Sequence, residues 1–209
     1  MKIGKIKFDD FPASVELAVL KNENKELKKE KEKLEKEVEI YKNLATVDPL
    51  TGLRNRREFE EFLERVENIF SGSGHYKRDK TGFYILKASL AILDIDDFKK
   101  INDNSGHLEG DRLLTDVASV LKYQIRCSDA SFRIGGDEFA VIFFGIDEMQ
   151  AFHQARRLMN EMPYVSLSVG ISRYYKGDTP QQFFQKADDA LYAVKNNGKS
   201  GICLYSQIK

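Results

Sequence analysis

The sequence predicts an α+β fold, in which helices cover a central and mostly antiparallel sheet, preceded by a long coiled-coil helix. From residue 89 onward, short apolar runs alternate with segments of helical periodicity, in the order strand, helices, strand, strand, helix, strand, helix, strand. Two of these strands flank a glycine pair at residues 132–144, which favours an antiparallel hairpin. A Lys/Glu-rich heptad pattern at residues 14–46 predicts the coiled coil.

Length and composition limit what this chain can be. Its 209 residues leave room for one domain plus an accessory segment, and the 33 basic residues balance the 33 acidic ones, which argues against a binder of nucleic acid polymers. No apolar run approaches the roughly 18 residues that cross a bilayer, and residues 1–13, expected to be a tail, lack the apolar centre of a signal peptide. Cys127 and Cys203 have no metal-site spacing. We therefore expect a cytoplasmic protein with two reduced thiols and no membrane segment in this chain.

The heptad positions at residues 14–46 predict a parallel homodimer. Leucine occupies one position in three successive heptads, and polar residues interrupt the other, as in two-stranded coiled coils. The alternative is a single solvated helix stabilised by i,i+4 pairs of Lys and Glu. We favour the dimer because an isolated helix of this polarity has nothing else to pack on. The two positions hold Leu17, Asn24, Lys31, Val38 and Ala45, and Leu20, Leu27, Leu34 and Tyr41.

A turn separates the heptads from the globular domain that we assign to residues 47–209. Pro49 ends the helical run and Gly52 allows a turn. Asn55 then has the character of an N-cap with Glu58 as its capping-box partner. The polar, glycine-rich segment from residue 71 to 82 is expected to be a loop, in which His75 is solvent-exposed and has no role. The helix before it has an apolar stripe of Phe59, Phe62, Leu63, Val66 and Phe70.

Acidic residues follow the first strand. The apolar run 89–93 ends in Asp94-Ile95-Asp96-Asp97, and strand alternation places Asp94 and Asp96 on the same side. Acids at the carboxyl end of a buried strand lie where α/β folds place their ligands. Alternatively, Asp96 or Asp97 caps the next helix, which begins at Phe98, but capping leaves Asp94 unexplained.

More acids stand at the hairpin. The pair Gly135-Gly136 predicts a two-residue turn with positive φ, and Asp137 and Glu138 follow it directly. Burying carboxylates next to an apolar strand is costly unless a cation or hydrogen-bond donors compensate.

The remaining elements complete the sheet and its cover. Helices are expected after the turn at 104–111, at 147–160 and at about 180–195, and strands at 165–171 and 202–204. His153 is expected at the surface. This order suggests a split βαβ sheet with helical cover, as in nucleotide-polymerising palm domains. The inner faces of the helices are predicted to hold Leu113, Leu114, Val117, Val120, Leu121 and Ile125, then Phe152, Ala155 and Met159, then Phe184, Ala187 and Leu191.

The acids predict a magnesium nucleotide site if the two strands are neighbours. Phosphoryl transfer commonly uses divalent ions held by carboxylates from different strands, and Mg²⁺ prefers oxygen ligands. Asp94, Asp137 and Glu138 supply such a set. Lys99 and the backbone amides of the helix that starts at Phe98 are placed to reach a phosphate.

Gly135-Gly136-Asp137-Glu138-Phe139 resembles the signature of the GGDEF family of diguanylate cyclases, and residues 48–57 resemble the motif that opens the family's domain. The resemblance implies a palm or nucleotidyl-cyclase type fold for residues 47–209. It also implies an enzyme that condenses two GTP into cyclic di-GMP plus two pyrophosphates. The symmetric product would need two half-sites facing each other, which the coiled-coil homodimer would bring together.

The resemblance also assigns roles to single residues. Asp94, the Ile95 carbonyl and Asp137 would hold two Mg²⁺ (or Mn²⁺) ions per active site, and Glu138 would assist at the reacting hydroxyl or the metal shell. The remaining assignments are guanine recognition by Asn102 and Asp111, phosphate binding by Phe98, Lys99, Lys195 and Lys199, and product inhibition at an RxxD site formed by Arg126 and Asp129.

Two of these assignments carry a reservation in the sequence. Lys199 falls where the family has an arginine, so the charge is kept but the bidentate fork is lost. Arg126 and Asp129 are equally compatible with a surface ion pair.

Other functions fit part of the pattern. A catalytically silent member could bind cyclic di-GMP at Arg126 and Asp129, although the intact acids speak against it. A related cyclase could make a mixed cyclic GMP-AMP, although Asp111 suits guanine. The coiled coil could also be a plain dimeric scaffold with solvated carboxylates.

Overall fold

The computed structural model describes residues 13–71 and 87–208. It divides into two compact units, Met1–Ala45 and Thr46–Lys209, and each is described by itself. The predicted tail up to residue 12 and the predicted loop around His75 lie outside the described residues. Within those residues, no helix combines the length and the apolar character that crossing a membrane requires.

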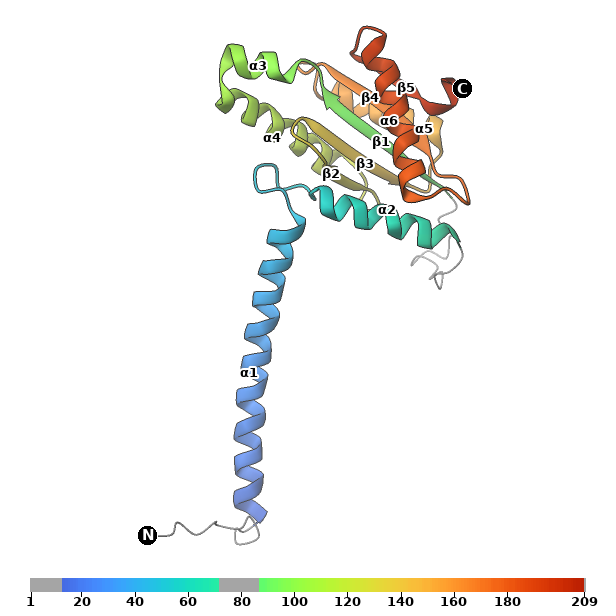
Figure 1. The fold of residues 1–209 in the computed structure, drawn as a ribbon. Helices are drawn as coiled ribbons and strands as arrows, with labels where there is room; N and C mark the ends of the chain where they lie inside the picture. Colours follow the sequence, from blue (N-terminus) through green and yellow to red (C-terminus); the bar gives the residue numbers. More distant parts are fainter. Residues whose placement is uncertain (1–12, 72–86, 209) are drawn as a thin grey trace. The chain divides into compact units, whose positions relative to one another are not determined.

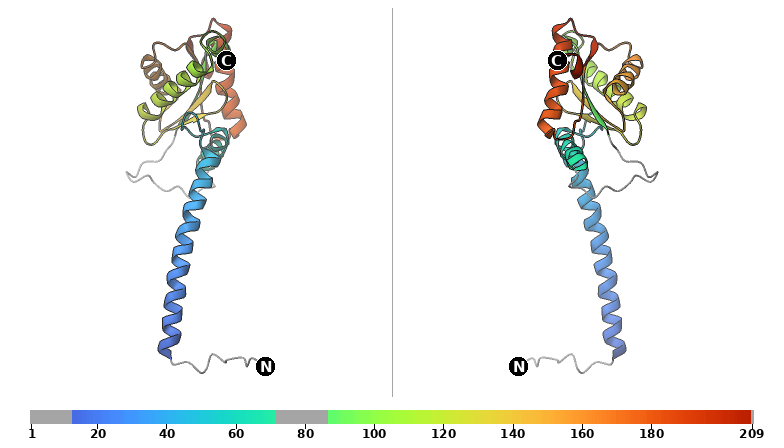
Figure 2. Two further views of the ribbon diagram at one scale, coloured as in Figure 1. Left: turned by 90° about the vertical axis from the view of Figure 1, so that its left-hand side faces the viewer. Right: turned by 90° about the vertical axis from the view of Figure 1, so that its right-hand side faces the viewer.

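The first unit is dominated by one uninterrupted helix, α1 (Ala13–Thr46), drawn in blue in Figures 1 and 2. Its heptad leucines are exposed, for example Leu27 at 61% and Leu34 at 53%. The ion pair between Lys31 and Glu35 spans 3.7 Å at i,i+4 spacing. The predicted helix is therefore confirmed, whereas its pairing with a second copy remains a prediction.

The second unit is built on a five-stranded mixed sheet in the order β2-β3-β1-β4-β5. The first four strands in this order pair antiparallel, and β4 pairs parallel with β5, so the predicted fold class is confirmed. The strands are β1 (Ala88–Ile95), β2 (Ala130–Arg133), β3 (Glu138–Phe144), β4 (Leu167–Arg173) and β5 (Gly201–Leu204).

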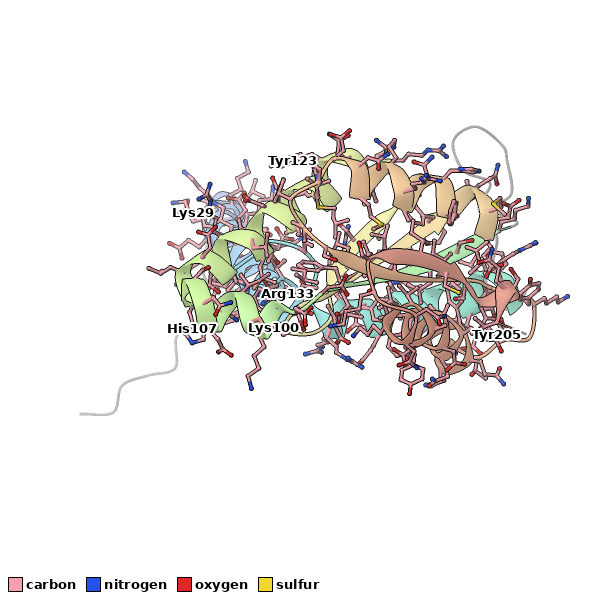
Figure 3. The ribbon with its side chains drawn as sticks, turned by 90° about the horizontal axis from the view of Figure 1, so that it is seen from above. Lys29, Lys100, His107, Tyr123, Arg133 and Tyr205 are labelled. Carbon is pink, nitrogen blue, oxygen red and sulfur yellow. The ribbon has the colours of Figure 1, made fainter. Side chains whose placement is uncertain are left out.

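Helices cover both faces of the sheet. One apolar cluster joins α4 and α5 to one face, and another joins α2 and α6 to the opposite face. Figure 3 shows the strands between these two helical layers. The helices are α2 (Arg56–Ser71), α3 (Phe98–Ser105), α4 (His107–Gln124), α5 (Glu148–Asn160) and α6 (Pro180–Asn196), followed by the short 3-10 helix η2 (Tyr205–Gln207).

The residues predicted for the inner faces all pack on the two apolar clusters, but the prediction is only partly correct. In α5, Ala151, Ala155 and Leu158 are fully buried, whereas Phe152 and Met159 are only partly buried. The same kind of difference occurs in α6. Phe183 is fully buried there, whereas Phe184 is only partly buried beside α2, under the Arg56 guanidinium. The backbone of α6 lies directly on β4 at Gly170: a Cβ at this position would stand 2.1 Å from the Ala187 carbonyl oxygen and 2.2 Å from the Leu191 nitrogen. A side chain on Gly170 would therefore push α6 off the sheet.

Two local predictions need correction. The Asn55 side chain does cap α2, because its Oδ1 accepts from the Glu58 nitrogen at 3.1 Å, but the Glu58 carboxylate binds Arg65 at 2.6 Å instead of closing a capping box. The predicted two-residue turn with positive φ is wrong. Four residues, 134–137, connect β2 and β3, and neither Gly135 nor Gly136 has a positive φ.

Candidate functional site

The sheet register brings together the acids predicted to act in catalysis and metal binding. Asp94 in β1 lies opposite Glu138 in β3, and the backbone nitrogen of Ile95 donates to the carbonyl oxygen of Asp137 at 3.2 Å. The end of β1 and the start of β3 are therefore adjacent. Asp94, Ile95, Asp137 and Glu138 share one edge of the sheet although more than forty positions separate them in the sequence.

These carboxylates are electrostatically crowded. Asp94 is only 7% exposed, and burial raises its pKa, with Asp137 adding to the shift and Lys195 opposing it. The pKa of Glu138 is also raised, first by burial and then by the charge of Asp94. The Lys195 ammonium stands 2.7 Å from Oδ2 of Asp94. The site therefore favours a cation, because a positive charge relieves both the burial cost and the mutual repulsion.

The donor chemistry fits a small divalent ion. Two carboxylates and the Ile95 carbonyl are oxygen donors, and Mg²⁺ in nucleotide sites is bound by one or two carboxylates together with substrate phosphates. Among residues 13–71 and 87–208, no group of three or more His, Cys, Asp or Glu side chains is arranged to hold a metal. Lys195 is the cation that contacts Asp94 in this structure.

Gly135, in the loop that carries Asp137, lies directly against the Glu138 side chain. A Cβ on Gly135 would lie 2.3 Å from Oε2 of Glu138. Both Ile134 and Gly135 donate their backbone N–H to the Glu138 carbonyl, at 2.9 and 3.3 Å. A side chain at Gly135 would therefore displace the Glu138 carboxylate from its present position, and the glycine does not adopt a left-handed backbone.

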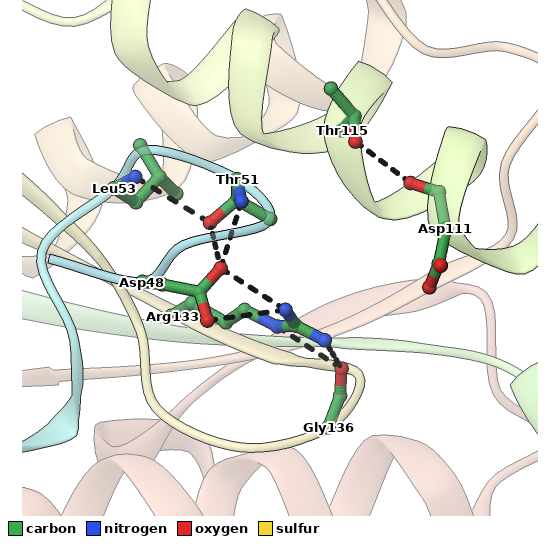
Figure 4. A network of polar contacts seen from close by, with 7 residues as sticks. All are labelled: Asp48, Thr51, Leu53, Asp111, Thr115, Arg133 and Gly136. Atoms are coloured by element: carbon green, nitrogen blue, oxygen red, sulfur yellow. Dashed lines mark hydrogen bonds and ion pairs between the residues drawn. The ribbon is translucent and has the colours of Figure 1, made fainter.

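Arg133, to which the sequence analysis assigned no role, fastens this loop to the turn after α1. Its Nη2 and Nε donate to the Gly136 carbonyl at 2.7 and 3.3 Å, and its Nη1 donates to the Asp48 carboxylate at 3.1 and 3.3 Å. Asp48 also accepts from the nitrogen and Oγ1 of Thr51, at 2.8 and 2.6 Å (Figure 4). Burial alone would raise the pKa of Asp48, but the bonds from Thr51 and Arg133 outweigh it and lower that pKa. Its position directly before the glycine loop is the sequence feature from which this role of Arg133 could have been predicted.

Asp96 has a structural role that the sequence analysis did not assign. The side chain is 7% exposed and accepts from Oγ of Ser166 and Oγ of Ser168, both at 2.6 Å, and from the nitrogen of Ser200 at 3.0 Å. It therefore ties the end of β1 to β4 and to the turn before β5. The serines that alternate with apolar residues before and within β4 are the sequence feature from which hydrogen bonds to a buried acid could have been predicted.

Asp97 does not cap α3 with its side chain, and Asp96 does not either, so the predicted cap is wrong. Asp97 occupies the N-cap position with φ 56°, and its carboxylate instead binds the ammonium groups of Lys199 and Lys100, each at 2.9 Å. The Lys199 hydrogen bond, followed by that of Lys100, lowers the pKa of Asp97. The same contact raises the pKa of Lys199.

The predicted guanine-reading residues lie on neighbouring helices, α3 and α4. Helix α4 approaches Asn102 through Gly110, where a Cβ would stand 1.9 Å from Oδ1 of Asn102. That oxygen is buried and has no hydrogen-bond partner in the described part of the chain. Asp111 is exposed, and its backbone carbonyl accepts from Thr115 at 2.8 Å (Figure 4). A buried acceptor without a donor is costly, which favours a ligand that brings donors. Lys99 is exposed on α3.

Arg126 and Asp129 lie away from these acids. The Asp129 carboxylate accepts from the backbone nitrogens of Arg126 at 3.3 Å and of Phe144 at 3.1 Å. No salt bridge joins the two side chains in the ranges that the structure describes, so the surface ion pair considered above does not form. Phe144 and Glu138 are the two ends of β3, which a rise of ~3.4 Å per residue separates by about 20 Å.

Comparison with known proteins identifies the family. The sequence profile described as "Diguanylate cyclase, GGDEF domain" matches residues 45–201. The chain belongs to the GGDEF diguanylate cyclase family. It is 33% identical over 173 residues to diguanylate cyclase DgcP of Pseudomonas aeruginosa, covering 78% of this chain and 24% of that protein. It is 32% identical to the response regulator PleD of Caulobacter vibrioides, covering 76% of this chain and 36% of PleD. The chain thus spans only part of these relatives.

A solved structure extends the similarity into α1. The coiled coil and GGDEF domain of DgcB from Caulobacter crescentus, in complex with c-di-GMP, has a TM-score of 0.78 and 27% sequence identity. The match covers 88% of this chain and 98% of that one.

Proposed function

We propose that this protein is a diguanylate cyclase, which condenses two GTP molecules into cyclic di-GMP and releases two pyrophosphates. The observation that carries the proposal is the register of β1 and β3, which sets Asp94 opposite Glu138 and beside Asp137. Family membership supports the reaction class.

This edge of the sheet would bind two Mg²⁺ or Mn²⁺ ions, with Asp94, the Ile95 carbonyl and Asp137 as ligands. Such ions, when bound, neutralise triphosphate charge and lower the pKa of an attacking hydroxyl. Asp94 would exchange its contact with Lys195 for this role, which frees the lysine for a phosphate oxygen. Glu138, whose pKa burial raises, would accept a proton from a 3′-hydroxyl or assist in the metal shell.

The substrate would be read by groups on the first two helices after β1. The unpaired Oδ1 of Asn102 can accept from a guanine N–H, and the Asp111 carboxylate can accept from the N1–H and exocyclic amine. Adenine lacks these donors, so the buried acceptor would stay unpaired. Lys99, Lys195, Lys199 and the amides at Phe98 would bind the phosphates.

We propose that catalysis requires a homodimer formed through α1. A symmetric product made from two nucleotides needs two half-sites, and residues 13–71 and 87–208 supply one set of these acids. The exposed heptad leucines of α1 offer an apolar seam for a second copy, which would raise the local concentration of the other half-site.

We also propose that cyclic di-GMP binds at Arg126 and Asp129 and stops turnover. The Arg126 side chain is exposed and does not pair with Asp129, so its guanidinium can stack on a guanine or bind a phosphate. At about 20 Å along β3 from Glu138, this would be a separate, inhibitory site.

The reaction is tested by incubating the full chain with GTP, or with GTP and ATP, in the presence of Mg²⁺ and resolving the products by chromatography. We expect cyclic di-GMP from the wild type, and none from Asp137→Asn. Glu161→Gln, an exposed acid at the end of α5, is the matched control and should retain turnover. A protein that binds cyclic di-GMP without making it would be a receptor, a mixed product would indicate a cyclic GMP-AMP synthase, and neither binding nor turnover would leave only a scaffold.

The dimer is tested by Leu27→Asp, which places a charge in the proposed seam. We expect this variant to sediment as a monomer and to bind GTP without cyclising it at low protein concentration. Lys36→Asp introduces the same residue on the outer face of the heptads and should remain dimeric and active. Full turnover by monomeric Leu27→Asp would exclude the coiled-coil requirement.

A further inference from the structure

The turn between α6 and β5 holds Lys199 in an uncommon backbone conformation. Lys199 has φ 66° and Ser200 has φ 51°, the left-handed region that L-residues other than Asn and Asp seldom adopt. Two backbone bonds fix the turn: the Lys199 nitrogen donates to the Val194 carbonyl at 3.0 Å, and the Ser200 nitrogen donates to the buried Asp96 carboxylate at 3.0 Å. These bonds therefore fix the position of the Lys199 backbone, from which its side chain extends.

The ammonium of Lys199 is already occupied by a carboxylate of the facing turn. Its Nζ lies 2.9 Å from Oδ1 of Asp97, which also contacts Lys100. Asp97 itself has φ 56°. The turn after β1 and the turn before β5 are thus joined by the Lys199–Asp97 ion pair as well as by the hydrogen bond from Ser200 to Asp96.

This ion pair is weak enough for a ligand to break. The side chains of Lys199 and Asp97 are 40% and 42% exposed, and exposed ion pairs of this kind contribute little to stability because water and salt screen them. The Asp96 contacts, by contrast, are buried and would persist. A polyanion that enters the site can therefore take Lys199 from Asp97 without disturbing the turn.

We propose that Asp97 competes with the substrate triphosphate for Lys199, so that its carboxylate lowers the affinity of the site for GTP. This inference rests on the proposed function, because it takes Lys199 as a triphosphate ligand. Asp97 contacts neither the acids on β3 nor the guanine-reading residues in the described interactions, and it acts through Lys199. Because water and salt screen exposed ion pairs, we expect the competition to change the affinity by only about two- to five-fold.

Asp97→Asn tests the competition without straining the turn, since asparagine tolerates the left-handed region that Asp97 occupies. The affinity of the full chain for a non-hydrolysable GTP analogue with Mg²⁺ is measured by calorimetry, and KM and kcat are measured with GTP. We expect Asp97→Asn to bind the analogue two- to five-fold more tightly, with the gain appearing in KM and not in kcat. Asp103→Asn removes the same charge from an exposed position on α3 and should change neither value as much.

A double-mutant cycle with Lys199→Met separates competition for Lys199 from general repulsion of the triphosphate. If Asp97 acts through Lys199, the gain from Asp97→Asn disappears in the Lys199→Met background. An equal gain in that background, an unchanged affinity, or weaker binding by Asp97→Asn would each overturn the inference. A wild type that binds the analogue but makes no cyclic di-GMP would contradict the proposed function alone. A wild type that does not bind the analogue would contradict both.

Discussion

Replacing Arg133 with methionine should destabilise the domain and loosen the loop that carries Asp137. The Arg133 and Asp48 side chains are 14% and 19% exposed, and the guanidinium binds both the Asp48 carboxylate and the Gly136 carbonyl. Hydrogen bonds to charged groups contribute ~1.5–3 kcal/mol. Asp48 keeps two bonds from Thr51, and the Gly136 carbonyl is exposed to water, so neither acceptor is left orphaned.

We therefore expect Arg133→Met to lower the free energy of unfolding by about 2 kcal/mol, which is less than the sum for two charge-assisted contacts because both acceptors keep other partners. For a protein of this size, that corresponds to a fall in Tm of about 4–8 °C. Methionine retains an apolar stem of similar length, so the fall in stability measures the contacts of the guanidinium and not the packing of the stem. Urea and thermal unfolding measure the effect. Arg57→Met is the control, because Arg57 is 71% exposed and makes one i,i+4 pair with Glu61.

The contact between Arg133 and Asp48 also predicts how the stability of the domain depends on pH. The pKa of Asp48 is lowered from its ordinary value of 3.8, so its ionised form stabilises the folded state above that pH. The stability difference between the wild type and Asp48→Asn should be present at neutral pH and should vanish as the pH falls below 3.8 through the lowered folded-state value. A loss below about 0.5 kcal/mol for Arg133→Met, equal to that of Arg57→Met, would refute the reasoning.

Further substitutions test packing, electrostatics and inhibition. Gly170→Ala should cost about 3 kcal/mol because its Cβ would meet the backbone of α6, whereas Gly201→Ala, with its nearest neighbour 3.7 Å away, should be nearly neutral in thermal unfolding. The pKa of Glu138 is raised from 4.5, so its charge costs stability as the pH rises above that value. Glu138→Gln should therefore unfold at a higher temperature than the wild type at neutral pH without Mg²⁺. An equal or lower Tm would contradict the burial argument. Arg126→Ala should abolish the slowing of turnover as cyclic di-GMP accumulates, and progress curves that still level off early would remove Arg126 from the inhibitory site.

The fold followed from the sequence because each element carries its own periodic signal. The apolar stripe of α2, the run that became β1 and the alternation in β4 are local patterns, and their order indicated the sheet. The strand ends alone predict that Asp94 and Asp137 meet only if their strands are neighbours, and the family resemblance assigns both to one metal site.

The contacts between turns did not follow from the sequence, because they depend on backbone geometry that no local pattern encodes. The sequence offers Asp96 or Asp97 as a helix cap, but the Asp97 carboxylate binds Lys199, over a hundred positions away, from a left-handed backbone. The glycine pair was read as a tight hairpin, whereas Gly135 makes room for the Glu138 carboxylate. Arg133 and Asp48 are separated by 85 positions, so their pairing needed the three-dimensional structure.

A crystal structure with a non-hydrolysable GTP analogue and Mn²⁺ would test the proposed site most directly. Anomalous scattering should locate manganese within about 2.3 Å of carboxylate oxygens from both Asp94 and Asp137, with a triphosphate oxygen completing its ligands. Manganese absent from this edge of the sheet while the analogue is bound, or bound by acids on one strand alone, would contradict the account.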